Sequence, residues 1–163
     1  MNLYLSAKLA KALDIRPSKN YALSPNKYEN WYCDLFYGDR YPYIMLTNHA
    51  SLFTVVGAKS GVRCDSELIT MMNRCVRDVM ESFQLEMVYQ TAVAPLFART
   101  SFYSRKDKSV IGSMNDLIYM IKTSPKLDEM SVHDMSIESS KVPMSAICYK
   151  YAVEAFSEMG RIQ

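Results

Sequence analysis

The sequence predicts an α+β domain with a mainly antiparallel sheet of four to five strands and three to four helices packed mostly on one face. Short runs of aromatic and β-branched residues lie close together before residue 57, and a long run with helical spacing follows them. Two further helical runs come later in the chain. With 163 residues, 49% hydrophobic and 22% charged, the chain is long enough for one domain over 1–163 with a sizeable core.

A short strand and a helix open the chain. Residues 2–5 predict the strand, and Ser6 is suited to cap the helix, which ends at Pro17. Residues 16–30 contain two prolines and little periodicity, so we expect an irregular connection there.

A hairpin follows this connection. The runs 31–37 and 41–47 are rich in aromatic and β-branched residues, and they flank a Gly-Asp-Arg turn at 38–40. Another strand over 52–56 comes after a polar turn. These three consecutive strands predict an antiparallel meander.

The clearest helix of the sequence spans residues 65–84. Its apolar residues recur three and four positions apart, and charged residues mostly fill the other face. Asp65 or Ser66 is the expected N-cap. The inward residues are Leu68, Met72, Cys75, Val76, Val79, Met80 and Phe83.

The next region predicts a strand, a loop and a helix. Residues 93–100 read as a strand that Pro95 interrupts, which indicates an edge position or a bulge. A polar loop over 101–108 then leads to a helix beginning near Ser109.

The C-terminal region is polar at first and apolar later. Residues 125–141 predict a loop with a short strand. Pro143 suits the first turn of a last helix, whose apolar stripe runs from 144 to 159.

Cysteine spacing and hydropathy give expectations about metals and location. Cys33, Cys64, Cys75 and Cys148 have no C-x-x-C spacing, so neither a zinc site nor a thioredoxin-type pair is predicted, and we expect no metal and no cofactor. No apolar stretch approaches the roughly 18 residues of a membrane span. We therefore expect a cytoplasmic protein that does not bind membranes.

The basic residues give a weak hypothesis of nucleic-acid contact. Lys and Arg are spread along the chain, and the formal net charge is only +2. One cluster, Arg99 to Lys108, includes Arg105 and has aromatic residues between its charges. A solvated loop is the more usual explanation of such a run, so nucleic acid is not the favoured partner.

The segment 109–116 is the most informative stretch of the chain. Ser109 or Ser113 can accept a hydrogen bond from an unpaired amide at a helix N-terminus, and either can contribute to a binding site. Asn115 and Asp116 can orient a substrate and act as a base, but we favour the interpretation that they satisfy backbone amides. On that interpretation, removing either side chain costs about 1 to 3 kcal/mol of stability.

An enzyme is the alternative to a binding module. A small hydrolase or transferase could work through Asn48, His49, Arg99, Asn115 and Asp116 if the fold brings the strand ends and the Ser109 helix together. A lone histidine in a turn is more often simply solvated. The sequence contains no P-loop, G-x-G-x-x-G, H-E-x-x-H or G-x-S-x-G motif.

Methionine and tyrosine are frequent, with twelve of each. Methionines at helical spacing usually fill irregular cores, although flexible thioethers also suit adaptable binding surfaces. The methionines in question are Met72, Met80, Met114 and Met120.

The tyrosines gather around the predicted hairpin, where strand alternation should leave some rings exposed. Tyr41 and Tyr43 are the candidate contacts, and packing of the rings on the sheet face is the competing interpretation. A protein partner bound by a non-enzymatic domain is therefore the favoured function. The oligomeric state stays open.

Four segments of the chain resemble one uncharacterised family of small bacterial and archaeal proteins, at times found on mobile elements. The most specific of them is Ser-Val-Ile-Gly-Ser-Met-Asn-Asp-Leu at 109–117. The other three are the N-terminal strand with 8–13, the runs 31–35, 46–48 and 52–53, and the run from 143–145 to 149–150. The resemblance implies a compact α/β domain, supplies no activity, and suggests a link to mobile elements or to defence and counter-defence systems.

Overall fold

Five strands form one mixed sheet in the computed structural model of the chain, which describes residues 1–160. The strand order is β4-β3-β2-β1-β5. β1 pairs in parallel with both β2 and β5, whereas β2, β3 and β4 pair antiparallel in succession. The strands are β1 (Asn2–Leu5), β2 (Asn30–Tyr37), β3 (Pro42–Asn48), β4 (Thr54–Ala58) and β5 (Ser101–Ser104).

The sheet confirms the predicted α+β class, the strand number and the meander. The antiparallel ladders pair seven residues of β2 with β3 and five residues of β3 with β4, against four pairs in each parallel ladder. Six α-helices accompany it in the described residues, more than the three to four expected. They are α1 (Ala7–Ala12), α2 (Asp65–Ser82), α3 (Glu86–Val88), α4 (Lys108–Thr123), α5 (Val132–Ser140) and α6 (Ala152–Glu158).

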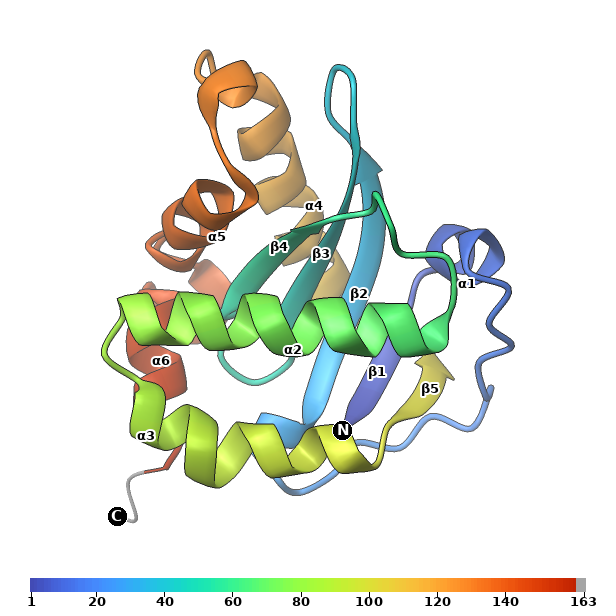
Figure 1. The fold of residues 1–163 in the computed structure, drawn as a ribbon. Coiled ribbons are helices and arrows are strands. Elements are labelled where there is room, and N and C mark those ends of the chain that lie inside the picture. Colours follow the sequence, from blue (N-terminus) through green and yellow to red (C-terminus); the bar gives the residue numbers. More distant parts are fainter. Residues whose placement is uncertain (161–163) are drawn as a thin grey trace.

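The helices cover both faces of the sheet rather than mostly one, and this detail corrects the expected layering. Figure 1 shows α2 across one face, with α4 behind the sheet. The physical reason is the parallel part of the sheet, β2-β1-β5, because parallel strands are joined by crossovers and are buried on both faces. β2 shows it directly, since residues 30–36 are buried without alternation.

The α2 side holds the more apolar of the two cores. Leu68, Met72, Val76 and Met80 recur along the inner face of α2 and are fully buried, as the helical spacing predicted. They pack on the sheet together with rings such as Trp31, in one cluster that also contains part of α6. The helix begins at Asp65, but the N-cap is Cys64, whose side chain makes no capping bond to a backbone amide, so the expected cap at Asp65 or Ser66 is wrong.

The opposite side is covered by α4 and α5. The inner face of α4 buries Val110, Met114 and Leu117 against the sheet. α5 packs along the edge strand β4, where the Ser136 hydroxyl accepts from the Val56 amide at 2.8 Å. This contact satisfies a backbone group of an edge strand that would otherwise be free to pair with another chain.

Two predictions around residue 100 are corrected by the structure. Residues 93–100 are not a strand, because the chain there forms a π-helical turn, η2 (Tyr89–Val93), and a 3-10 helix, η3 (Ala94–Ala98). Pro95 lies in the first turn of η3, where a helix tolerates the missing amide hydrogen. The strand comes next, as β5, inside the stretch expected to be a loop.

The C-terminal region is also more helical than the sequence predicted. Residues 125–141 contain a 3-10 helix, η4 (Leu127–Glu129), and the helix α5. Pro143 does not lie in the first turn of the last helix. It pairs with Tyr151 in an isolated β-bridge, and α6 begins after that bridge.

Within residues 1–160, no helix is long and apolar enough to cross a membrane. Residues 161–163 of the predicted 1–163 domain lie outside the described part, and the single domain stays a prediction.

Candidate functional site

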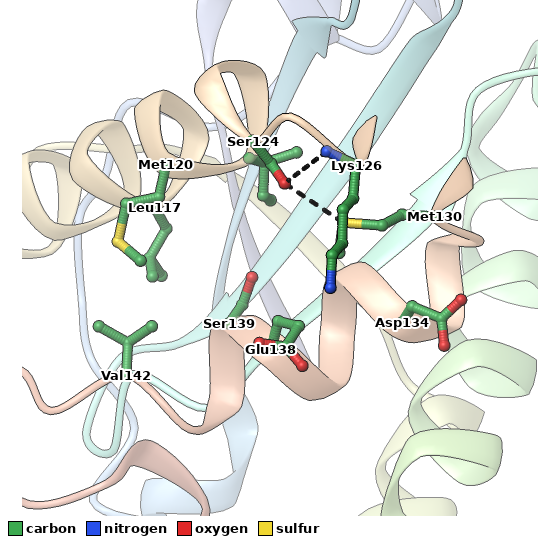
Figure 2. Close-up of a pocket in the computed structure, with 10 residues that line it drawn as sticks. Leu117, Met120, Ser124, Lys126, Met130, Asp134, Glu138, Ser139 and Val142 are labelled. Carbon is green, nitrogen blue, oxygen red and sulfur yellow. Dashed lines mark hydrogen bonds between the residues drawn. The ribbon is translucent and has the colours of Figure 1, made fainter. Parts of the chain in front are cut away.

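An open cavity of about 410 Å³ lies between α4 and α5. Its floor is apolar, and charged side chains stand at its rim, as Figure 2 shows. We call it the α4–α5 groove. It is lined by Leu117, Met120, Ile121, Ser124, Lys126, Met130, Asp134, Glu138, Ser139 and Val142.

Helical spacing on both walls places these side chains. On α4 and its C-cap, positions 120 and 121 come three and four residues after 117 and four and three residues before 124, so all four share one face. α5 starts with a capping box in which the Ser131 hydroxyl accepts from the Asp134 amide and the Asp134 carboxylate accepts from the Ser131 amide. This cap fixes the start of α5, so that Asp134 and Glu138 lie one turn apart.

Two methionines give the groove an adaptable surface. The Met120 side chain is 49% exposed, whereas Met72, Met80 and Met114 are fully buried. The core interpretation is therefore confirmed for the other three methionines and is wrong for Met120. Met130 lies across the groove, where the Ser124 hydroxyl donates to its sulfur at 3.8 Å.

The two carboxylates at the rim differ in how they are held. Hydrogen bonds from the Ser131 hydroxyl and amide lower the pKa of Asp134. The Glu138 carboxylate makes no hydrogen bond or ion pair within the described residues. The Lys126 ammonium extends over the groove in Figure 2, and it forms no ion pair with any residue from 1 to 160.

The sequence matches the family model described as Domain of unknown function (DUF6933) over residues 2–155. The chain belongs to this family. Membership confirms the resemblance to a family of unknown function. A search of the curated proteins found no match.

In this DUF6933 domain, His49 meets the start of the α4 helix. Its Nε2 lies 3.0 Å from Oδ2 of Asp107, and its ring lies 5.7 Å from the Tyr32 ring, centroid to centroid. Asp107 is also the N-cap of α4, since its carboxylate accepts from the Ser109 and Val110 amides. Burial raises the pKa of Asp107, but the bonds from His49 and from these two amides outweigh it and the pKa is lowered.

The cap is therefore Asp107, and not Ser109 or Ser113 as the sequence suggested. Ser109 is exposed, and Ser113 is buried on the inner face of α4. Sequence reasoning passed over Asp107 because it assigned residue 107 to a loop, although an aspartate two residues before an apolar helical run is itself a cap signal.

Asn115 and Asp116 point into solvent from α4. Neither side chain makes a hydrogen bond or ion pair within residues 1–160. The interpretation that they satisfy backbone amides is therefore wrong, because the cap is made two turns earlier.

Asn48 is a structural residue at the end of β3. Its side-chain oxygen accepts from the Ala50 and Ser51 amides, each at 3.1 Å, and its amide group donates to the Lys27 carbonyl at 3.0 Å. All the polar atoms of this buried side chain are thus engaged in shaping the turn.

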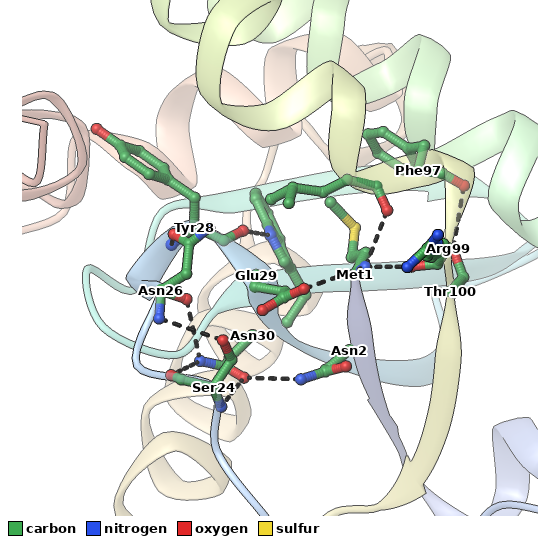
Figure 3. A network of polar contacts seen from close by, with 12 residues as sticks. Met1, Asn2, Ser24, Asn26, Tyr28, Glu29, Asn30, Phe97, Arg99 and Thr100 are labelled. Atoms are coloured by element: carbon green, nitrogen blue, oxygen red, sulfur yellow. Dashed lines mark hydrogen bonds and ion pairs between the residues drawn. The ribbon is translucent and has the colours of Figure 1, made fainter.

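Arg99 lies in a different polar network, shown in Figure 3. Its carbonyl accepts from the amino group of Met1, which also donates to the Leu96 carbonyl at 2.8 Å and lies 3.8 Å from the Glu29 carboxylate. Of the five proposed enzyme residues, His49 is the one whose side chain pairs with a carboxylate within residues 1–160, that of Asp107. The hydrolase or transferase alternative stays a prediction.

The basic cluster from Arg99 to Lys108 does not form one patch. Arg105 pairs with the buried carboxylate of Asp34 at 3.1 Å, and Lys8 lies 3.4 Å from the same group. The Lys106 ammonium donates to a backbone carbonyl. Contact with nucleic acid through this cluster remains an untested, weaker alternative.

The hairpin tyrosines split between surface and core. Tyr41 is 65% exposed at the tip, and its neighbour Tyr37 is 59% exposed. Tyr43 is half-buried, with its ring 5.4 Å from that of Phe36. The Tyr43 ring packs against the apolar cluster on the α4–α5 side, and burial raises its pKa.

Sequence reasoning missed most of the groove, although one signal for it is present. Lys126, Met130, Asp134 and Glu138 all fall in the stretch expected to be a loop. The pattern Ser131-x-x-Asp134 is a helix-start signal that predicts α5.

No group of three or more potential metal ligands occurs within residues 1–160.

Proposed function

We propose that this domain is a protein-binding module whose α4–α5 groove receives an apolar segment of its partner. The observation that carries the proposal is the open, apolar groove with the half-exposed Met120 in its wall. Its volume of about 410 Å³ lies within the range of concave binding sites in proteins.

The character of the groove favours a protein over other partners. Methionine side chains adjust to partners of different shape, which suits recognition of peptide segments. The carboxylates of Asp134 and Glu138 at the rim would repel the phosphates of a nucleic acid.

The groove also lacks the arrangement that hydrolysis requires. The Ser124 hydroxyl faces the Met130 sulfur rather than a base, and the His49–Asp107 pair is not part of the lining. A non-catalytic binding role is therefore the function that the geometry supports best.

Site-specific photo-crosslinking in the producing organism tests the proposal. A photoreactive phenylalanine replaces Met120 in one protein and Tyr119 in a matched control, and both are irradiated in cells. Tyr119 is the suitable control because it lies next to Met120 on α4 and is 70% exposed but does not line the groove.

We expect discrete protein adducts from position 120 and few or none from position 119, with the partner identified by mass spectrometry. Equal adducts from both positions, or none from position 120, would contradict binding in the groove.

A further inference from the structure

The charge of the α5 wall leads to a more specific inference, which rests on the proposed function. We propose that the partner segment presents a Lys or Arg beside its apolar anchor, and that this basic side chain pairs with Glu138 or Asp134. The occupant is thus a cationic and apolar segment of another protein.

The wall is acidic in a chain that is slightly basic overall. The α5 helix, residues 132–140, contains Asp134 and Glu138 and no Lys or Arg, whereas the whole chain has a net charge of +2. Such a local excess of one sign next to an apolar floor favours an oppositely charged partner and disfavours an acidic one.

Both groove carboxylates have acceptor capacity left. Both bonds from Ser131 go to the Oδ2 atom of Asp134, which leaves its Oδ1 atom without a bond in the described residues. Glu138 is exposed and unpaired there. In Figure 2 the two carboxylates are directed to different sides of α5, so a guanidinium or ammonium of the partner can pair with either of them.

Lys126 occupies the place where the partner's cation would arrive. Its side chain extends over the groove from the opposite wall in Figure 2, on the side of Glu138 and Asp134. It is exposed and forms no ion pair within the described residues, so its flexible stem can swing away. Lys126 would then compete weakly with the partner, and its removal should strengthen binding.

Selection from random 12-residue peptides displayed on phage, using the whole chain as bait, tests the inference. We expect the enriched peptides to carry Lys or Arg within about one helical turn of a large apolar residue. Synthetic copies with a fluorescent label are then measured by anisotropy against the parent and its variants.

Glu138→Lys should weaken these peptides about tenfold, because it places like charges opposite each other. The matched control Glu129→Lys, on an exposed acidic residue outside the lining, should change the affinity by less than about twofold. Lys126→Ala should strengthen binding about two- to threefold. Thermal melts of all variants confirm folding.

The outcomes separate this inference from the proposed function. Peptides that lose affinity in Met120→Ala but carry no basic residue and tolerate Glu138→Lys would overturn the inference alone. If no selected peptide depends on Met120, both fail. A dimer that Met120→Ala dissociates in sedimentation would assign the groove to a second copy and overturn the inference as well.

Discussion

The two faces of the sheet are covered in different ways. On one face, the single long helix α2 closes a core of fully buried apolar side chains, including Met72 and Val79. On the other face, α4 and α5 leave a groove of about 410 Å³ between them, with Met120 half-exposed in its wall.

The two faces of the sheet also differ in their buried polar groups. The α4–α5 side contains the Tyr32 hydroxyl, which bonds to that of Tyr21 at 2.8 Å, and the Ser140 hydroxyl, which donates to the Thr54 carbonyl of β4 at 2.9 Å. Burial raises the pKa of Tyr32, and burial raises that of Tyr4 to about 12, so both hydroxyls stay protonated at neutral pH. The α2 side thus sets stability, and the α4–α5 side combines specific polar contacts with room for a ligand.

The largest effect is expected on the α2 side. Met72→Asp places an unpaired charge among apolar side chains and should prevent folding, since Met72 is fully buried. Met120→Asp, at an exposed position, should fold and melt close to the parent. Circular dichroism with thermal melting compares the two variants, and a folded Met72→Asp protein would show that the α2 face is not the main core.

A smaller effect is expected at the start of α4. Asp107→Ala removes the N-cap and the partner of His49, and should cost about 1 to 2 kcal/mol of unfolding free energy. Asp116→Ala removes an exposed side chain on the same helix and should stay within about 0.5 kcal/mol. Urea unfolding at neutral pH measures both, and equal losses would mean that Asp107 is not the cap that holds α4.

The charge of Asp107 should be visible in the pH dependence of stability. Asp107→Asn keeps a capping oxygen but loses the charge, and we expect a cost of about 0.3 to 1 kcal/mol at pH 5. Because the pKa of Asp107 is lowered in the folded state, the stabilisation is present above the unfolded pKa and is lost as the pH falls through the folded pKa. Urea melts at pH 5 and at about pH 2 should show the parent and variant converging, and a constant difference would exclude a charge effect.

The smallest effect on stability is expected at the hairpin tip. Tyr41→Ala should change the unfolding free energy by less than about 0.5 kcal/mol, because the ring is 65% exposed. Tyr43→Ala should cost more, since its ring packs against Phe36. If Tyr41→Ala clearly lowers the unfolding free energy, the hairpin tip belongs to the core of the α4–α5 side. If Tyr41→Ala instead reduces the crosslinks formed at position 120 and leaves the unfolding free energy unchanged, the tip is part of the binding surface.

Local sequence patterns were sufficient for most of the fold. The hairpin, β4 and α2 follow from alternation and helical spacing, and Ser6 caps α1 by accepting from the Leu9 amide, as predicted. The pairing of β1 with β5 could not be predicted in this way, because it joins segments about a hundred residues apart and Ser101–Ser104 has only four residues. The position of helices on both faces depends on that same parallel pairing.

The groove was harder to predict than the fold because its two walls come from different kinds of pattern. α4 has a clear apolar stripe, but α5 buries three serines, Ser136, Ser139 and Ser140, and among apolar residues only Met135 is fully buried on this helix. A helix whose buried face consists mostly of serine has a weak apolar period. Met120 lies on the same face of α4 as buried residues. It is exposed because α5 packs in a position that leaves the groove open beside it.

Truncation of one methionine on each face distinguishes a closed core from an open groove. Urea unfolding at neutral pH gives the unfolding free energies of Met72→Ala and Met120→Ala relative to the parent. We predict a loss of about 2 to 5 kcal/mol for Met72→Ala, from the cavity left in the α2-side core, and a change within about 0.5 kcal/mol for Met120→Ala. Equal losses would contradict the account, because Met120 would then be a core residue rather than part of an open binding groove.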